Sequence, residues 1–125
     1  MSATSSIEIN RARIHYEEMG SGSPVVLAHN GIGDMRTWDD QFPVFAESCR
    51  AIRYDMRGWG RSVCPSGAFS HSRDLAALLQ ALDAAPACVV GSSFGGLVAL
   101  DLALESPECV SALVLAGSAL GGYRF

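Results

Sequence analysis

The sequence predicts an α/β protein with a mostly parallel sheet that begins with an antiparallel hairpin. Short apolar segments rich in Val, Ile and Leu alternate with longer segments of helical character along the 125 residues. The first of these segments alternate apolar and polar residues, which is typical of strands buried on one face, whereas a later one is continuously apolar. Alternation of strand and helix favours parallel strands joined by right-handed crossovers.

The N-terminal part is predicted to form the hairpin and the first fully buried strand. Residues 7–10 and 13–17 alternate apolar and polar side chains, as the two strands of a hairpin do. Glycine and serine at residues 20–23 indicate a turn. The apolar run at residues 24–28 is then expected to be a strand buried on both faces.

Two helices and another strand are predicted in the middle of the chain. Residues 38–48 suggest a short helix, with Pro43 near its start or breaking it, and residues 50–55 suggest the next strand. Ser70 is predicted to be the N-cap of a helix that runs to about residue 84. Four leucines lie on one face of that helix and should point into the core: Leu75, Leu78, Leu79 and Leu82.

A G-x-S-x-G pattern stands at residues 91–95, between a predicted strand and a predicted helix. The apolar run at residues 87–90 precedes it, and good helix formers follow to about Glu105, with Pro107 as a stop. A strand, a sharp turn and a helix in this order present the hydroxyl of the middle serine above the end of a sheet. Ser93 is therefore the candidate nucleophile, and the alternative is an ordinary Gly/Ser turn. A last strand is expected at residues 110–116.

Composition limits the classes of partner. A hydrophobic content of 49% supports one packed domain, and a net charge of −4 offers no basic patch for nucleic acid or an anionic membrane. No run of about 18 uncharged apolar residues predicts a transmembrane helix, and the N-terminus lacks the pattern of a secretory signal. We therefore expect a cytoplasmic protein that binds neither nucleic acid nor membranes.

No cofactor or metal is predicted. Four cysteines are scattered singly along the chain: Cys49, Cys64, Cys88 and Cys109. None of them has another Cys or a His at metal-ligand spacing. We expect mostly buried, reduced thiols, and the alternative is a disulfide pair. The Gly-Ile-Gly segment at residues 31–33 is too short for a dinucleotide-binding loop. The chain contains no lysine that could serve a P-loop.

Three motifs occur in a fixed order: His-Asn-Gly-Ile-Gly at residues 29–33, Asp-Met-Arg-Gly-Trp-Gly-Arg-Ser at 55–62, and Gly-Ser-Ser-Phe-Gly-Gly at 91–96. In this order they resemble the α/β-hydrolase superfamily, with phrasing closest to its 3-oxoadipate enol-lactonase and small-esterase branch. The resemblance covers residues 7–119 and implies a hydrolase acting on a small-molecule ester or lactone. C–C bond hydrolases and cofactor-free haloperoxidases share these motifs, whereas the Asp nucleophile of dehalogenases and epoxide hydrolases is disfavoured by serine at residue 93.

Backbone N–H groups are the expected oxyanion donors. One belongs to the residue after the nucleophile, Phe94, at the start of a helix whose dipole also favours negative charge. The resemblance implies Gly31 as the second donor, rather than Ile32. The chain departs from the family pattern at Asn30, where glycine is usual, but asparagine tolerates a left-handed backbone.

Several residues near these motifs have a structural and a functional interpretation. Asp55 and Arg57 invite a catalytic role, but the resemblance implies that their motif holds a loop beside the active site. Trp59 either lines the pocket entrance or covers apolar surface. Trp38 is expected to pack rather than to contact substrate.

A base and an acid for Ser93 are not found where this fold places them. The order in the chain should be Ser, then Asp or Glu, then His, yet all three histidines precede Ser93: His15, His29 and His71. The interpretation is that residues 1–125 form a single N-terminal part of an α/β-hydrolase core domain, ending after about six strands and before the cap and C-terminal strands. The last strand would then be an open sheet edge that permits self-association or pairing with another chain. The alternative is an inactive truncated product or a non-catalytic binding module.

Overall fold

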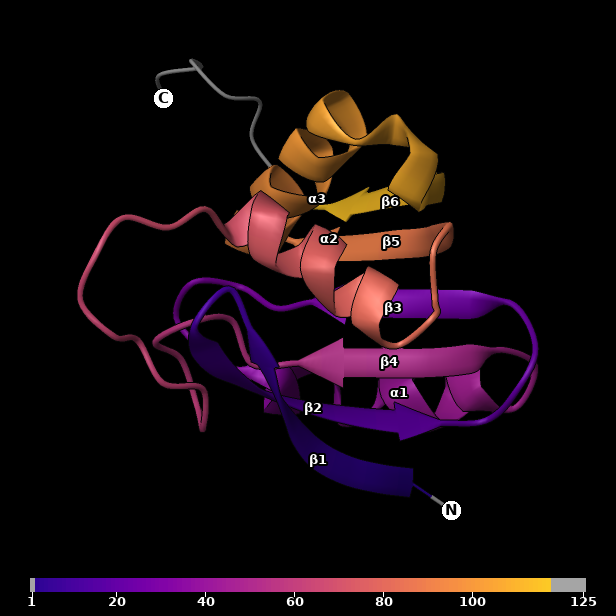
Figure 1. The fold of residues 1–125 in the computed structure, drawn as a ribbon. Coiled ribbons are helices and arrows are strands. Elements are labelled where there is room, and N and C mark those ends of the chain that lie inside the picture. The colour runs from indigo at the N-terminus through magenta and orange to yellow at the C-terminus, as the bar shows by residue number, and fades with distance from the viewer. Residues whose placement is uncertain (1, 118–125) are drawn as a thin grey trace.

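The computed structural model describes residues 2–117, and within them six strands form one mixed sheet (Figure 1). The strands are β1 (Ser2–Ile9), β2 (Ala12–Met19), β3 (Pro24–Ala28), β4 (Arg50–Tyr54), β5 (Ala87–Ser92) and β6 (Val110–Ala116). Their order is β1-β2-β4-β3-β5-β6. The β1–β2 and β2–β4 pairs are antiparallel, and the other three pairs of neighbours are parallel. The predicted fold class, a mostly parallel sheet with an N-terminal antiparallel hairpin, is confirmed.

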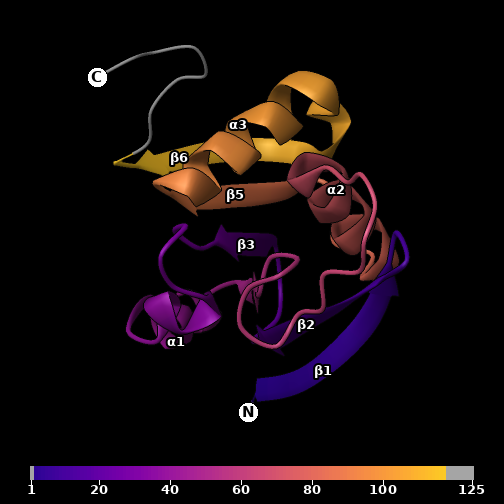
Figure 2. The same cartoon turned by 90° about the vertical axis from the view of Figure 1, so that its left-hand side faces the viewer.

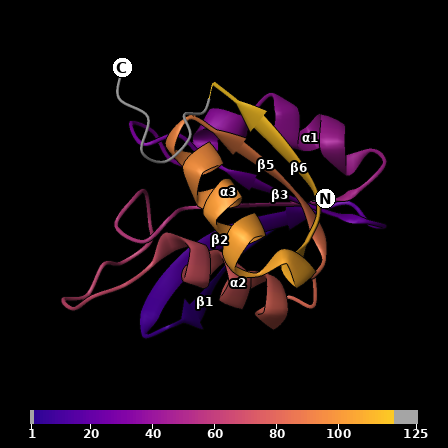
Figure 3. The ribbon, with the colours of Figure 1, turned by 90° about the horizontal axis from the view of Figure 1, so that it is seen from above.

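Helices cover both faces of this sheet. The α-helices are α1 (Gln41–Ala46), α2 (His71–Ala81) and α3 (Phe94–Glu105), and the short 3-10 helices are η1 (Met35–Trp38) and η2 (Pro107–Cys109). Figures 2 and 3 show α1 on one side of the strands and α2 with α3 on the other. The sheet is therefore a middle layer, as expected for strands buried on both faces.

Alternating side chains of the central strands fill two separate cores. In β3, Val26 and Ala28 join the core under α2 and α3, while Val25 and Leu27 join the core under α1. Leu75 and Leu79 of α2, both with 0% exposure, project into the first of these cores. A one-residue slip of β3 would exchange the two sets, so burial on both faces fixes its register.

Two predicted helices differ in their ends. The helix expected at residues 38–48 is shorter, since α1 covers only Gln41–Ala46. Trp38 instead ends η1, which the Asp34 side chain caps by accepting the Arg36 N–H. The predicted N-cap of α2 is confirmed, since Ser70 accepts the Arg73 N–H. Helix α2 ends earlier than predicted, and the left-handed residue Asp83 (φ 51°) follows it.

The β6 strand lies at one end of the sheet and has no strand on its outer side within residues 2–117 (Figure 1). Its Val114 and Leu115 side chains are 49% and 40% exposed. An open edge of this kind can pair with another chain, so association through β6 stays a prediction. The predicted end of the core at residues 121–125 lies outside the described residues.

The cysteines are free, but the expectation that they are mostly buried is wrong. Cys109 alone is buried, Cys64 is exposed, and Cys49 and Cys88 lie between these limits. Burial raises the pKa of the Cys109 thiol.

Within residues 2–117, no helix combines the length and the apolar character that a membrane crossing requires.

Candidate active site

Three loops meet at the carboxyl ends of β3, β4 and β5. Because these strands are parallel neighbours, with Val26 opposite both Ile52 and Val89, their C-terminal ends lie at one edge of the sheet. The segments that leave this edge are residues 29–34, 55–62 and 93–94, and each contains or belongs to one of the three motifs identified in the sequence. The fold therefore brings the motifs together at the place where ligands bind in open α/β sheets.

Ser93 has an unusual backbone conformation at the junction of β5 and α3. Its φ of 54° and ψ of −114° are sparsely populated for a residue with a side chain. Its N–H donates to the Ala116 carbonyl at 2.9 Å, and its own carbonyl accepts the Gly96 N–H at 2.9 Å. The side chain is exposed and its Oγ has no hydrogen bond with any residue in the described part of the chain.

The glycines that flank Ser93 make this tight turn possible. A Cβ on Gly91 would lie 2.5 Å from the Gly95 carbonyl oxygen, and a Cβ on Gly95 would lie 2.1 Å from the Ala28 carbonyl oxygen. Each added Cβ would overlap backbone atoms, which belong to α3 and to the end of β3 and cannot move aside without disrupting these elements. The two glycines of the G-x-S-x-G pattern are thus required by packing.

The two expected oxyanion donors lie beside each other. A Cβ built on Gly31 would be 3.3 Å from the Phe94 Cβ, so the loop after β3 touches the start of α3. Phe94 is the first residue of α3, where the backbone N–H has no acceptor within the helix. The Ile32 N–H donates to Asn30 Oδ1 at 3.3 Å, which leaves the Gly31 N–H as the better candidate in this loop.

Asn30 does not adopt the left-handed backbone that asparagine was expected to tolerate at this position. It is not among the residues with positive φ in residues 2–117, and its side chain closes the loop by the bond to Ile32. The turn is therefore built from a side-chain hydrogen bond typical of asparagine rather than from unusual dihedral angles.

His29 has a structural role directly behind this loop. It is fully buried, its Nε2 accepts the Met56 N–H at 3.0 Å, and its Nδ1 lies 2.6 Å from the Asn30 carbonyl oxygen. These contacts define the neutral tautomer with hydrogen on Nδ1. Burial lowers the pKa of His29, which also favours the neutral ring. Both ring nitrogens are occupied, so His29 cannot serve Ser93 as a base.

The other two histidines lie in different surroundings. His15 belongs to β2, and its buried Nε2 has no hydrogen-bond partner among the described residues. His71 begins α2 and contacts aromatic rings, with its centroid 5.5 Å from that of Phe94. Burial lowers the pKa of His71. Neither residue forms a hydrogen bond with Ser93 Oγ, so no histidine of residues 2–117 is placed as a base for the candidate nucleophile.

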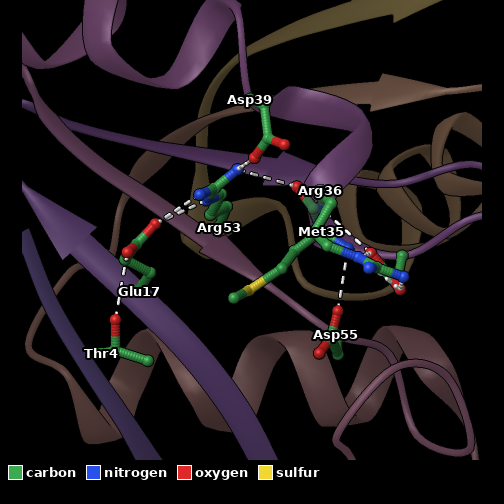
Figure 4. A network of polar contacts seen from close by, with 8 residues as sticks. Thr4, Glu17, Met35, Arg36, Asp39, Arg53 and Asp55 are labelled. Atoms are coloured by element: carbon green, nitrogen blue, oxygen red, sulfur yellow. Dashed lines mark hydrogen bonds and ion pairs between the residues drawn. The ribbon is translucent and has the colours of Figure 1, made fainter.

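Asp55 joins two loops near the site (Figure 4). Its Oδ1 accepts the Met35 N–H at 2.8 Å and its Oδ2 accepts the Arg61 N–H at 3.0 Å. A Cβ on Gly60 would lie 2.4 Å from the Asp55 carboxyl carbon, so this approach requires glycine. Both carboxylate oxygens are engaged by backbone donors, which supports the structural interpretation of Asp55.

A further network in Figure 4 ties β4 to the hairpin and to η1. Arg53 donates to Glu17 Oε1 at 2.8 Å, to Asp39 Oδ1 at 2.6 Å and to the Met35 carbonyl at 3.2 Å. Thr4 completes the network with a bond to Glu17. The loop after β3 is thus held from the α1 side of the sheet as well.

Arg57 is committed to a buried ion pair. Its Nε and Nη2 donate to the two oxygens of Asp74, each at 2.9 Å, and the two side chains are 5% and 4% exposed. The Asp74 carboxylate raises the pKa of Arg57 further. This pair connects the loop after β4 with helix α2 and supports a structural role for Arg57.

Aromatic rings cover the site from the side of the β4 loop. Trp59 donates its indole N–H to the Gly31 carbonyl at 3.0 Å, and its ring stacks on Phe94 at 5.8 Å and 28°. His71 meets the Trp59 ring edge-on at 5.4 Å, and Phe69 lies 5.0 Å from His71. The sequence pattern did not place His71 or Phe69 here, because no local signal fixes the path of the long loop before α2.

The chain matches known proteins across most of its length. A family model described as the alpha/beta hydrolase fold matches residues 23–121. The 2-hydroxymuconate semialdehyde hydrolase of Pseudomonas sp. (strain CF600) is 38% identical over 115 residues, covering 86% of this chain and 40% of that protein.

Solved structures give the same result. Est816, described as an N-acyl homoserine lactone degrading enzyme, is 33% identical with a TM-score of 0.86, over 91% of this chain and 45% of its own. Epoxide hydrolase CorEH is 29% identical with a TM-score of 0.93, over 100% of this chain and 47% of its own.

The chain therefore belongs to the α/β-hydrolase fold family. It spans about 40% of the length of curated relatives that it matches. None of the relatives named above is an enol-lactonase, so the narrower resemblance to that branch stays a prediction.

Among residues 2–117, no group of three or more His, Cys, Asp or Glu side chains is arranged to hold a metal ion.

Proposed function

We propose that this chain carries the nucleophile and the oxyanion hole of a serine hydrolase that cleaves a carboxylic ester or a lactone. The observation that carries the proposal is the geometry of Ser93, whose exposed side chain stands on a strained turn beside the first N–H of α3. Backbone strain of this kind is costly and is concentrated at functional sites. Gly31 and Phe94 are the proposed donors to the oxyanion.

The proposed reaction follows from these groups. Ser93 Oγ attacks the carbonyl carbon while its proton passes to a general base, and the two N–H groups receive the negative charge on the carbonyl oxygen. The alcohol leaves with a proton from the base, and water then releases the acid from the serine ester. No cofactor enters this scheme.

The base and the acid of the scheme are proposed to come from a further part of the same core domain. The chain covers 40% of the semialdehyde hydrolase and 45% of Est816, which supports residues 1–125 as the N-terminal part of such a domain. The proposed serine nucleophile is the one feature of this chain that limits the substrate class, because it favours a substrate with an acyl group. A small-molecule ester or lactone agrees with the lactone-degrading activity in the name of Est816.

A fluorophosphonate probe tests the proposal directly. The protein, in the longest form that its gene encodes, should be labelled covalently, and labelling should vanish in Ser93→Ala but persist in Ser92→Ala. Hydrolysis of p-nitrophenyl acetate should follow the same pattern. Labelling that persists in Ser93→Ala would contradict the proposal.

A non-catalytic binding module is the second candidate. The free Ser93 Oγ, with no imidazole in hydrogen-bond contact within residues 2–117, is the observation that favours it. Absence of both labelling and Ser93-dependent turnover in the longest natural form would support this candidate instead.

A further inference from the structure

Trp59 contacts both residues whose backbone N–H groups are the proposed oxyanion donors. Its indole N–H donates to the Gly31 carbonyl oxygen at 3.0 Å, and its ring stacks on the Phe94 ring with centroids 5.8 Å apart. Gly31 follows β3, Trp59 follows β4 and Phe94 follows β5. Trp59 is therefore the side chain that links the three loops at the site.

The hydrogen bond acts on the peptide that follows Gly31. A peptide unit is planar, so a bond to its carbonyl oxygen also fixes the direction of the N–H on the opposite side. The Gly31–Ile32 peptide is held at its carbonyl by Trp59 and at its N–H by Asn30 Oδ1, 3.3 Å away. Both ends of this unit are therefore fixed.

The peptide that precedes Gly31 is held in the same way. The His29 Nδ1–H donates to the Asn30 carbonyl oxygen at 2.6 Å, which orients the N–H of Gly31. Gly31 thus lies between two peptide units, each held by the ring N–H of an aromatic side chain. Glycine has the freest backbone of all residues, so these two restraints together decide which dihedral angles Gly31 adopts between the two peptide units.

The Trp59 ring is itself restrained on several sides. His71 meets it edge-on at 5.4 Å, and the His29 ring lies 6.0 Å away. His29 in turn accepts the Met56 N–H, three residues before Trp59 in the same loop. The indole is therefore packed among neighbours and keeps its hydrogen bond at low entropic cost.

We propose that Trp59 is a positioning residue, which holds the Gly31 N–H and the Phe94 N–H in one fixed geometry for the oxyanion of the substrate. The inference rests on the function proposed above for Ser93. Oxyanion holes act because their donors are aimed before charge develops. Loss of the Trp59 hydrogen bond frees the Gly31–Ile32 peptide. Gly31 then loses the restraint on its C-terminal side, and the aim of its N–H is lost while substrate binding is retained.

Two tryptophan substitutions form a matched pair that tests this role. Trp59→Phe keeps an aromatic ring against Phe94 but removes the donor to Gly31. Trp38→Phe makes the same chemical change where no hydrogen bond is lost, because the buried Trp38 Nε1 has no acceptor among the described residues. Thermal melts of both variants establish that each one folds.

The expected result is a change in kcat without a matching change in KM. Removal of a whole oxyanion donor lowers kcat by about 10²–10³-fold, so loss of its positioning bond should lower kcat roughly 10-fold or more, up to that limit. The KM for p-nitrophenyl acetate should change less than about threefold, as expected when only a transition-state interaction is lost. The Trp38→Phe variant should keep both constants.

Phenyl trifluoromethyl ketone supplies a second readout. Its serine adduct carries an oxyanion, so its inhibition constant should rise in Trp59→Phe by the same factor by which kcat falls. A purely structural Trp59 would not give this proportionality. Equal kcat and inhibition constants in wild type and Trp59→Phe would overturn the inference, even though Ser93 remained the nucleophile.

The wild-type protein gives the answer if Trp59→Phe does not fold. The ketone adduct should shift the indole N–H resonance of Trp59 in a tryptophan-labelled sample, and leave that of Trp38 in place. An unmoved Trp59 resonance would overturn the inference. Failure of the proposed function itself is distinct, because the wild type would then show neither turnover nor adduct at Ser93.

Discussion

Replacement of Asp74 by alanine should reduce the free energy of unfolding by about 3–5 kcal/mol, because it leaves the Arg57 guanidinium buried without its counter-charge. The two side chains are only 5% and 4% exposed and share two bonds of 2.9 Å. Asn10 also loses a partner, since its side-chain amide donates to Asp74 Oδ1 at 3.1 Å. The remaining contacts of Arg57 are the Asn10 carbonyl at 3.1 Å and the Phe69 ring at 4.9 Å, and neither carries a negative charge that could neutralise it.

A double-mutant cycle in urea measures this coupling. Asp74→Leu and Arg57→Leu should each be strongly destabilising, while the combined variant should cost less than either single change, because no unpaired charge is then buried. Arg73→Leu is the control, since Arg73 is exposed on the same helix and should leave the unfolding midpoint unchanged. A cost below about 1 kcal/mol for Asp74→Ala, as for a surface pair, would refute the reasoning.

Two further predictions concern the tight turn around Ser93 and the histidine His71. Gly95→Ala should destabilise the protein beyond the ~1–3 kcal/mol usual for overpacking, because its Cβ would lie 2.1 Å from the Ala28 carbonyl oxygen; a thermal melt that matches wild type would contradict this. The pKa of His71 is lowered by burial, so below its unfolded pKa of about 6.5 the unfolded chain binds more protons and stability falls as the pH drops. His71→Phe should therefore make the free energy of unfolding less dependent on pH below about 6.5, although not independent, because burial also lowers the pKa of His29. An unchanged dependence in urea titrations at acid and neutral pH would contradict the second prediction.

Sequence patterns predicted the parts of the fold that local physical chemistry determines. The continuous apolar run of β3 predicts burial on both faces, and its side chains do divide between two cores. Ser70 predicts the start of α2 because a serine hydroxyl satisfies an N–H that the helix leaves free. These features depend on a few neighbouring residues, so the sequence was sufficient.

Features that depend on distant contacts could not be predicted in this way. The sequence did not predict η1, which the Asp34 side chain caps and whose Met35 N–H is held by the more distant Asp55. His71 reaches Trp59 and Phe94 only because a loop of sixteen residues between β4 and α2 folds back over the sheet edge. Loops of this length have no periodic pattern from which their path can be read.

The sequence motifs indicated which residues form the candidate site, whereas the structure gives the contacts that hold these residues in place. The family resemblance implied Gly31 rather than Ile32, and the structure adds a physical reason, since the Ile32 N–H already has an acceptor. Spacing left two roles open for Trp59, pocket lining and surface cover. Its indole bond to Gly31 points to a third role that no pattern contained.

The strain at Ser93 leads to a last prediction, in which glycine at residue 93 is at least as stable as alanine. At φ 54° and ψ −114° a residue with a Cβ costs about 1–3 kcal/mol, and glycine avoids this cost. Glycine also gains entropy in the unfolded chain, worth roughly 0.5–1 kcal/mol. Ser93→Gly should therefore be at least as stable as Ser93→Ala, and by up to about 2 kcal/mol more stable.

Urea unfolding of four variants tests this difference in sign. Ser93→Gly and Ser93→Ala both lack the hydroxyl, so they differ only in how the backbone tolerates the turn. The control pair is Ser92→Gly and Ser92→Ala, because Ser92 lies in β5 without positive φ and glycine should there be less stable by roughly 0.5–1 kcal/mol. If glycine is equally destabilising at both positions, the backbone of Ser93 stores no strain. If the sign reverses at Ser93 alone, the fold gives up stability to hold this hydroxyl in place, as expected of a catalytic nucleophile.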